Sequence, residues 1–267
     1  MGMEVIRLKP DYLYKYVSLE SENDYAKCPE GNEALNEKKF STLLNKEVWF
    51  SHPKVLNDPF EFQALVIEYD KLEKAGIPKD QIAEIRSMML DHYLISSFFG
   101  SEMETESFPM WAHYANNHKG FCIRYRVMDD ECIRKVNYFS RRTVVTDGVQ
   151  KMVEIFDKLK GPALEAEKKK LIAGLRHIYM QVLFLNYTVK HSSWSYEKEY
   201  RVIHEHTDKR DLVGPNVPAQ DVGLLADAVY LGFRCEYDER IREICSLLDI
   251  PCLKCRLDDK KFMVFAD

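Results

Sequence analysis

The stretch VVTDGVQKMVEIFDKLKGPALEAEKKKLIAGLRHIYMQVLFLN, residues 144–186, decides the fold class because it is helical while strand-like segments lie on both sides of it. Its apolar residues recur at three-to-four spacing, as on one face of an α-helix. Gly161-Pro162 divides the pattern into two helices, and the second has an apolar stripe made of Leu171, Leu175, Ile178, Val182 and Leu185. We therefore expect a helical insertion at 144–186 within a single α+β domain that spans residues 1–267.

Short aromatic and β-branched runs before and after this insertion indicate strands. The expected strands are 12–17, 48–51, 62–69, 94–99, 121–125, 196–206, 228–231, 252–256 and 262–265. Helices are expected at 36–45, 78–93, 109–116 and 236–249. Because strands and helices do not alternate strictly, the pattern argues against a doubly wound parallel sheet. It predicts a mixed, mainly antiparallel sheet with flanking helices.

The composition is that of a globular protein. Of 267 residues, 38 are Lys or Arg and 43 are Asp or Glu, which gives a net charge of −5. This acidity argues against nucleic acid and anionic membranes as partners, although a local basic patch is compatible with it. No apolar run reaches the roughly 18 residues of a membrane span. The seven cysteines are odd in number and scattered, which indicates reduced thiols and a cytoplasmic location.

The motifs of several common sites are missing or incomplete. Cys252-x-x-Cys255 has the spacing of a zinc knuckle, but it falls in an expected strand, so we interpret the two as buried thiols and expect no metal. His204-x-His206 places two imidazoles on one strand face without an evident third ligand. Neither a glycine-rich phosphate loop nor an esterase elbow is present in the sequence.

Three polar stretches remain as candidates for a functional site, and the first follows the expected strand 48–51. Asn57 and Asp58 have the chemistry of a capped turn, whereas His52 and Glu61 have no local structural task, and Phe60 is expected in the core. The candidate ligand-binding residues of this stretch are Phe50, Ser51, His52, Asn57, Asp58 and Glu61.

The second stretch is Met110–Gly120, in which Gly120 is placed to end the expected helix in the left-handed region. On a helix Trp111, Tyr114 and His118 share one face, and His113 lies on another. An aromatic surface flanked by imidazoles suits an aromatic ligand such as a nucleobase or nicotinamide. Packing of the two large aromatic rings in the core is the other interpretation.

The third stretch is Trp194–Ile203. On a strand Glu197, Glu199 and Arg201 point to the same side. Two interpretations stay open: an exposed face with a surface ion pair, or a carboxylate held in a cleft by the guanidinium. In the second case the carboxylate could stabilise a developing positive charge.

These stretches, in this order, resemble an uncharacterised bacterial family of domains of unknown function. The shared pattern is Leu-Tyr-Lys-Tyr, then aromatic-Phe-Ser with Leu-Asn-Asp-Pro-Phe-Glu, Trp-Ala-His-Tyr-Ala-x-x-His-x-Gly, Tyr-Glu-x-Glu-aromatic-Arg and Tyr-Leu-Gly. The matching segments are Leu13–Tyr16, Trp49–Glu61, Met110–Gly120, Trp194–Arg201 and Tyr230–Gly232.

The same order of elements is loosely similar to NAD-dependent ADP-ribosyltransferases. That resemblance implies that Lys15 contacts the NAD ribose, that Phe50 and Ser51 support a nicotinamide pocket, and that Glu199 is catalytic with Glu197. It also implies NAD as a co-substrate. A helical insertion and the Trp-Ala-His-Tyr motif are not part of the superfamily pattern.

Three hypotheses follow for the function. The chain is an NAD-consuming transferase or glycohydrolase, a non-catalytic module that binds a nucleotide or a small aromatic ligand, or a scaffold whose motif residues form a buried polar network. The helices of residues 144–186 could cover the cleft or supply a homodimer surface.

Overall fold

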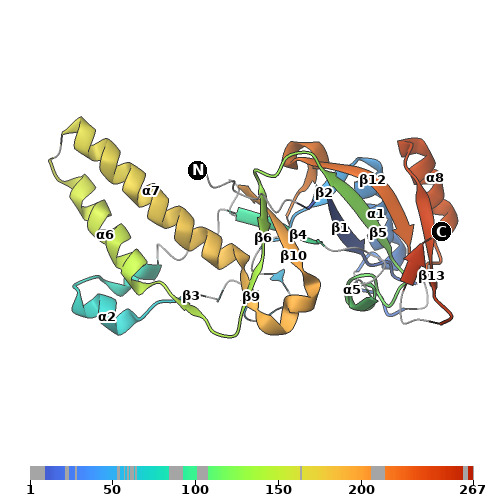
Figure 1. The fold of residues 1–267 in the computed structure, drawn as a ribbon, viewed down its shortest axis with the longest axis horizontal. Helices are drawn as coiled ribbons and strands as arrows, with labels where there is room; N and C mark the ends of the chain where they lie inside the picture. The colour runs from blue at the N-terminus through green and yellow to red at the C-terminus, as the bar shows by residue number, and fades with distance from the viewer. Residues whose placement is uncertain are drawn as a thin grey trace, which may run out of the picture.

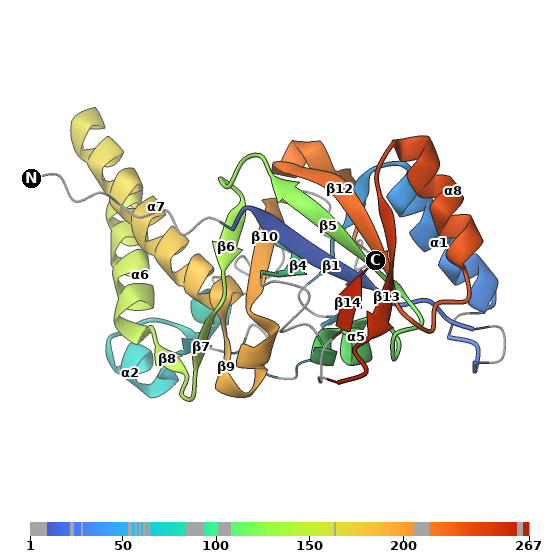
Figure 2. The same ribbon diagram turned by 45° about the vertical axis from the view of Figure 1, so that its right-hand side comes forward.

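The computed structural model describes residues 10–21, 24–27, 29–52, 55–56, 58, 60, 63, 65–83, 93–100, 108–162, 164–205, 214–260 and 264–266. Within them the chain is α+β, as expected, and its main sheet is mixed and mostly antiparallel. Neighbouring strands of this sheet follow the order β14-β13-β12-β5-β1-β4-β10-β6, and within it β12 and β13 are the pair that runs parallel (Figures 1 and 2). The strands are β1 (Tyr12–Val17), β4 (Tyr93–Phe99), β5 (Phe121–Val127), β6 (Ile133–Lys135), β10 (Glu199–Glu205), β12 (Leu224–Leu231), β13 (Cys252–Leu257) and β14 (Val264–Ala266).

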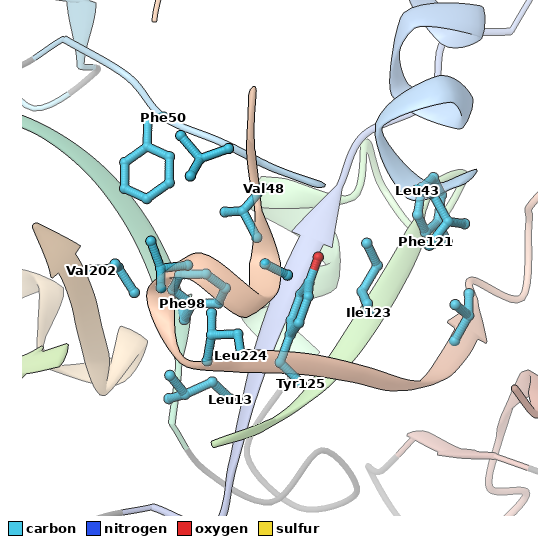
Figure 3. Packing of buried hydrophobic residues seen from close by; sticks show 14 of the residues in the cluster. Leu13, Leu43, Val48, Phe50, Phe98, Phe121, Ile123, Tyr125, Val202 and Leu224 are labelled. Atoms are coloured by element: carbon cyan, nitrogen blue, oxygen red, sulfur yellow. The ribbon is translucent and has the colours of Figure 1, made fainter. Parts of the chain in front are cut away.

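One face of this sheet forms the larger core with α1 (Asn32–Leu44) and α8 (Asp238–Leu248). Strand alternation turns Leu13, Ile123 and Tyr125 toward this side, where Figure 3 shows them packed together. The helix α8 faces them with Ile241 and with other apolar residues at three-to-four spacing. Periodicity in both elements therefore produces one continuous apolar layer.

The other face of the sheet is covered in part by α5 (Phe108–Tyr114). Trp111 is fully buried there, with its ring centroid 5.2 Å from that of Tyr16 on β1. Gly232 and Gly120 allow the chain to pass closely, since a Cβ on Gly120 would lie 2.0 Å from the Val17 carbonyl oxygen. Gly120 does not have the left-handed conformation that we expected; Asn116, Asn117 and His118 have it instead.

The two helices predicted at residues 144–186 are present as α6 (Thr146–Lys160) and α7 (Glu165–Thr188), which pack against each other as a hairpin. It stands at the β6 side of the sheet beside α2 (Tyr69–Lys74) (Figures 1 and 2). A second apolar cluster joins Val149 and Leu183 of the hairpin to Ile95 of β4. None of the helices in the described part of the chain combines the length and the hydropathy that a transmembrane span requires.

Smaller elements connect these layers. They are β2 (Glu47–Trp49) paired with β11 (Asn216–Pro218), β3 (Leu65–Val66) with β8 (Thr143–Val144), β7 (Asn137–Phe139) with β9 (Val189–His191), and the 3-10 helices η2 (Ser192–Glu197) and η3 (Ala219–Val222).

Two sequence predictions are wrong in this region. Among the described residues of the strand expected at 62–69, strand conformation is found at Leu65–Val66, and the chain turns into α2 at Tyr69. Phe60, expected in the core, is 56% exposed. Parts of two other predicted elements, residues 84–92 and 262–263, lie outside the described residues, as do Phe62 and His206.

Candidate functional site

The main sheet forks between β1 and β4. The strand β1 pairs with β5 along its whole length, but with β4 it forms one register pair, Tyr14 with Phe99. Farther along β4, Ile95 pairs with Ser51 instead, through backbone hydrogen bonds of 2.8 and 3.0 Å. A pocket of about 180 Å³ opens in this fork. Breaks in strand pairing are common next to active sites, so this pocket is the candidate functional site.

Lys15 of β1 enters the fork. Its Nζ donates to Ser96 Oγ at 2.7 Å and to the Ser97 carbonyl oxygen at 3.2 Å, and it lies 4.9 Å from the ring centroid of Phe98. Burial of the ammonium lowers the pKa of Lys15 to about 8, although the charge of Glu199 acts in the opposite direction. A fraction of this amine is therefore neutral near physiological pH.

Glu199 lines the same pocket as part of a buried ion network. The Arg201 guanidinium donates to both oxygens of its carboxylate, with Nε 2.7 Å from Oε1 and Nη2 3.1 Å from Oε2. Lys190 Nζ lies 3.3 Å from Oε2. Burial would raise the pKa of Glu199, but the charges of Arg201 and Lys190 outweigh it and lower this pKa to about 2. Of our two interpretations, the exposed surface pair is wrong: Glu199 and Arg201 are both buried.

Glu197 contacts this network but has a different environment. It ends η2 rather than lying on a strand, because Lys198 adopts the left-handed conformation with φ 43°. Tyr114 donates its hydroxyl proton to Glu197 Oε1, and Lys190 Nζ lies 2.6 Å from Oε2. Burial raises the pKa of Glu197, with Lys190 opposing the change. The pKa values of the neighbouring carboxyl groups Glu197 and Glu199 are thus shifted in opposite directions, a pattern that is typical of acid–base sites.

Sequence reasoning missed several residues of this network. Lys190 of β9 bridges the two carboxylates, and Ser96 and Ser97 bind Lys15. Tyr138 accepts a hydrogen bond of 2.8 Å from the Glu199 backbone N–H. No motif marks these residues in the sequence. A buried carboxylate pair does, however, require cationic partners. A lysine close to the third stretch in sequence, as Lys190 is, was therefore the available signal.

The first stretch contributes Ser51 to the pocket. Phe50 lies in the core with its ring centroid 5.3 Å from that of His204, and His52 is also buried. Asp58 is buried and accepts a hydrogen bond from the Phe60 N–H at 2.9 Å, as in the capped turn that we expected. Asn57 and Glu61 lie outside the described residues.

The second stretch contributes Tyr114 to the pocket, whereas its other aromatic residues lie elsewhere. Trp111 and His118 are buried together, with rings stacked at 5.9 Å, and burial and Arg234 lower the pKa of His118 to about 4. His113 is exposed beside Tyr196. The expected common face of Trp111, Tyr114 and His118 is not a single helical face, because α5 ends at Tyr114.

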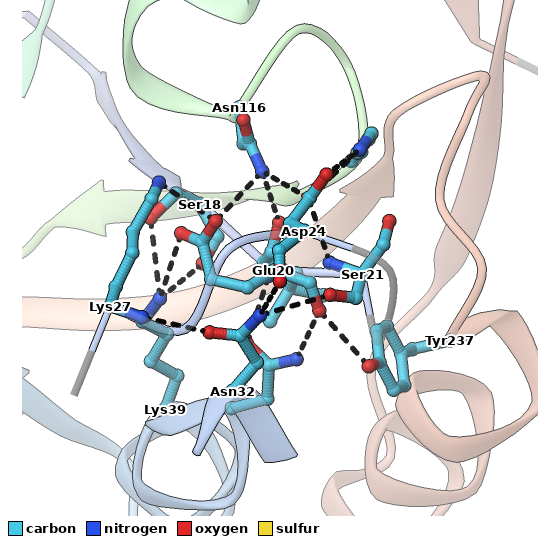
Figure 4. Close-up of polar contacts among 12 residues, drawn as sticks. Ser18, Glu20, Ser21, Asp24, Lys27, Asn32, Lys39, Asn116 and Tyr237 are labelled. Carbon is cyan, nitrogen blue, oxygen red and sulfur yellow. Dashed lines mark hydrogen bonds and ion pairs between the residues drawn. The ribbon is translucent and has the colours of Figure 1, made fainter. Parts of the chain in front are cut away.

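The loop after α5 is held by a polar network around Glu20 (Figure 4). Asn116 Nδ2 donates to the Leu19 carbonyl oxygen at 2.8 Å and to Glu20 Oε2 at 3.0 Å. Lys119 binds Asp24 at 2.8 Å. These contacts hold the left-handed loop in place, so Asn116 and Lys119 have a structural explanation.

A larger groove of about 540 Å³ adjoins the pocket, and both are lined by Lys15, Tyr16 and Tyr114. Its floor is formed by apolar residues of β5, and α1 and Trp49 form its rim. The two spaces together fall within the range of roughly 300–1,000 Å³ that is common for ligand sites.

No group of three or more His, Cys, Asp or Glu side chains that could hold a metal ion occurs within the described ranges. Cys252 and Cys255 are free thiols, and Cys252 contacts Cys245 of α8. The thiol of Cys252 is therefore packed against α8.

The searches among curated proteins and among solved structures gave no match. The model of a family described as protein of unknown function (DUF2971) matches residues 110–202, a segment that contains Tyr114, Lys190, Glu197 and Glu199 but neither Lys15 nor Ser51. The chain is thus similar, over this segment, to a domain of unknown function.

Proposed function

We propose that this chain is an NAD-dependent enzyme similar to ADP-ribosyltransferases, which cleaves the nicotinamide–ribose bond and passes the ADP-ribose to an acceptor or to water. One observation supports the proposal above the others. Lys15, Ser51, Glu197 and Glu199 come from distant segments and line one pocket, and they are four of the five residues assigned by the resemblance; the fifth, Phe50, lies in the core. The resemblance rests on the sequence alone, so it did not require these residues to lie close together in space.

The two carboxylates suit the two parts of this reaction. Departure of nicotinamide builds positive charge on the ribose, and a fixed anion stabilises that charge. Glu199, ionised and held by Arg201, is such an anion. Glu197 has a raised pKa and a hydroxyl partner in Tyr114, so it is the better group to take a proton from the acceptor.

The shape of the site is compatible with a dinucleotide. The forked pocket would take the nicotinamide and its ribose, and the adjoining groove would take the rest of the molecule. Lys15 lines both spaces, and its ammonium group is a cation that could bind a pyrophosphate in such a pose. A phosphate there would also stabilise the charged form of this lysine.

The test measures nicotinamide release from NAD by chromatography, with purified wild type, Glu197→Gln and Glu199→Gln. We expect Glu199→Gln to lose about 10²–10³-fold and Glu197→Gln about 10²–10⁴-fold in rate. Glu205→Gln, at the exposed end of β10, is the matched control and should keep full activity. No release by wild type, or equal release by all four proteins, would refute the proposal.

Binding of NAD measured by calorimetry separates the remaining hypotheses. The observation that favours a non-catalytic binding module is the complete ion pairing of Glu199, which leaves this carboxylate fully used by the protein. NAD binding without release would support that module. Absence of both would support a scaffold with a structural polar network.

A further inference from the structure

A second cavity lies behind the ion network. It has a volume of about 240 Å³ and is bounded by β9, by the turn after β7 and by Phe60 and Gln63. Lys190 lines both this cavity and the forked pocket. The parallel pairing of β7 and β9 sets Phe139 opposite His191, so the two rings are held on adjacent strands of one small sheet.

The cavity is cationic although the chain is acidic. Arg141 and Arg142 line it, and no Asp or Glu does among the residues that the structure describes. Both arginines are exposed, and neither has a carboxylate within 4 Å among the described residues. Two guanidinium groups that line one cavity form an anion site, since each can bind a phosphate through two parallel hydrogen bonds.

Aromatic rings stand beside these cations. Phe60 is 56% exposed and Phe139 is 49% exposed, and the Arg142 guanidinium lies 5.4 Å from the ring centroid of Phe60. Exposed phenylalanines next to arginine are typical of surfaces on which nucleobases stack. An inorganic anion would contact the guanidinium groups alone, so the two rings would have no role in binding it.

His191 adds a donor with a fixed direction. Its Nδ1 accepts a hydrogen bond from the Ser193 backbone N–H at 3.3 Å and lies 2.8 Å from Ser193 Oγ. In the neutral ring Nε2 therefore carries the proton and is free to donate.

We infer that this cavity binds the base-and-phosphate unit of a nucleotide, presented by a single-stranded nucleic acid or by a free nucleotide. The arginines contact the phosphate, and Phe139 or Phe60 stacks on the base. The two rings favour this ligand over a phosphopeptide, whose phosphate brings no heterocyclic base to stack. The inference requires no NAD turnover and stands independently of the proposed function.

The test measures fluorescence anisotropy of labelled 12-nucleotide single strands of DNA and RNA, with unlabelled AMP as competitor and no NAD present. We expect the double variant Arg141→Gln with Arg142→Gln to weaken binding at least 10-fold. The slope of log K against log salt concentration should become smaller by roughly one, since up to two phosphate contacts are lost. Phe139→Ala should weaken binding about 10-fold without changing the salt dependence.

The control is Arg240→Gln with Arg242→Gln on α8, which removes the same charge far from β7 and β9 (Figure 2). It should bind as wild type does. A strand that binds much more tightly than AMP identifies nucleic acid as the source, and equal affinities identify the free nucleotide. Absence of binding to both ligands, equal binding by all variants, or tighter binding of a phosphotyrosine peptide would overturn the inference.

Discussion

Replacing Glu199 with glutamine should lower the free energy of unfolding by about 3 kcal/mol at pH 7. The surrounding cations lower the pKa of this carboxyl from an ordinary value near 4.5 to about 2. At about 1.4 kcal/mol for each tenfold change in proton affinity, the ionised form contributes roughly this amount to stability. Glutamine keeps the shape but not the charge, so Arg201 and Lys190 lose the charge of Glu199, although Lys190 keeps its ion pair with Glu197.

The sign of the pH dependence follows from the lowered pKa. The contribution of Glu199 is fully present above the unfolded pKa near 4.5 and is lost as pH falls toward 2. The difference between wild type and Glu199→Gln should therefore shrink to about 1.4 kcal/mol at pH 3. The raised pKa of Glu197 acts in the opposite direction, but it is present in both proteins and largely cancels in the difference.

Urea unfolding followed by circular dichroism at pH 7, 5, 4 and 3 measures this difference. Glu205→Gln is the matched control, because Glu205 lies at the exposed end of the same strand and should change stability by less than about 0.5 kcal/mol. A difference for Glu199→Gln that stays constant with pH, or that is no larger than the control, would refute the charge network as the origin of stability.

Three further predictions concern other parts of the fold. Gly120→Ala should destabilise by about 3 kcal/mol in urea unfolding, because its Cβ would meet the Val17 carbonyl; Gly161→Ala, with its nearest atom at 3.4 Å, is the tolerated control. The His118 ring should titrate in NMR near pH 4 rather than 6.5, and its burial should make the protein less stable as pH falls from about 6.5 to 4; a midpoint above 6 contradicts this. Acylation of Lys15, followed by mass spectrometry, should reach half its maximal rate near pH 8, whereas a midpoint above 10 would place the amine in solvent.

Local patterns were enough to predict most of the architecture. The strand at residues 12–17 and the two helices divided at Gly161-Pro162 are present in the structure as predicted. In both cases side-chain period and turn chemistry agree, and a long periodic segment leaves little choice of conformation. The strict strand–helix alternation of a parallel sheet was correctly judged absent.

Errors occurred where a single backbone conformation interrupts a pattern. The alternation across residues 196–206 indicated one strand, but the left-handed Lys198 ends a 3-10 helix at Glu197 before β10 begins. A lysine carries no propensity for that conformation, which the surrounding contacts impose. Gly120 shows the converse case, since glycine is required there by the approach of Val17 and not by a positive φ.

The site could be predicted only in part, because pairing between distant segments is not visible in local sequence. The resemblance brought Lys15, Ser51 and Glu199 forward, and they share a pocket. Lys190 was not foreseen, because a single lysine in a short strand has no distinctive spacing. Of the two interpretations given for Trp111, packing in the core is confirmed.

The two carboxylates provide the strongest physical argument about what the pocket does. A network intended only for stability would pair each buried anion with its own cation, because unpaired charge in the interior is costly. Here Arg201 is committed to Glu199, while Glu197 shares Lys190 and contacts a tyrosine hydroxyl. Glu197 therefore keeps a raised pKa at the wall of an open pocket, where proton exchange with a bound molecule is possible. Glu197→Gln is therefore the more informative variant. It should lower the rate of nicotinamide release while it lowers the free energy of unfolding by less than Glu199→Gln does. A variant that loses stability but keeps its rate of nicotinamide release would assign both residues to the scaffold.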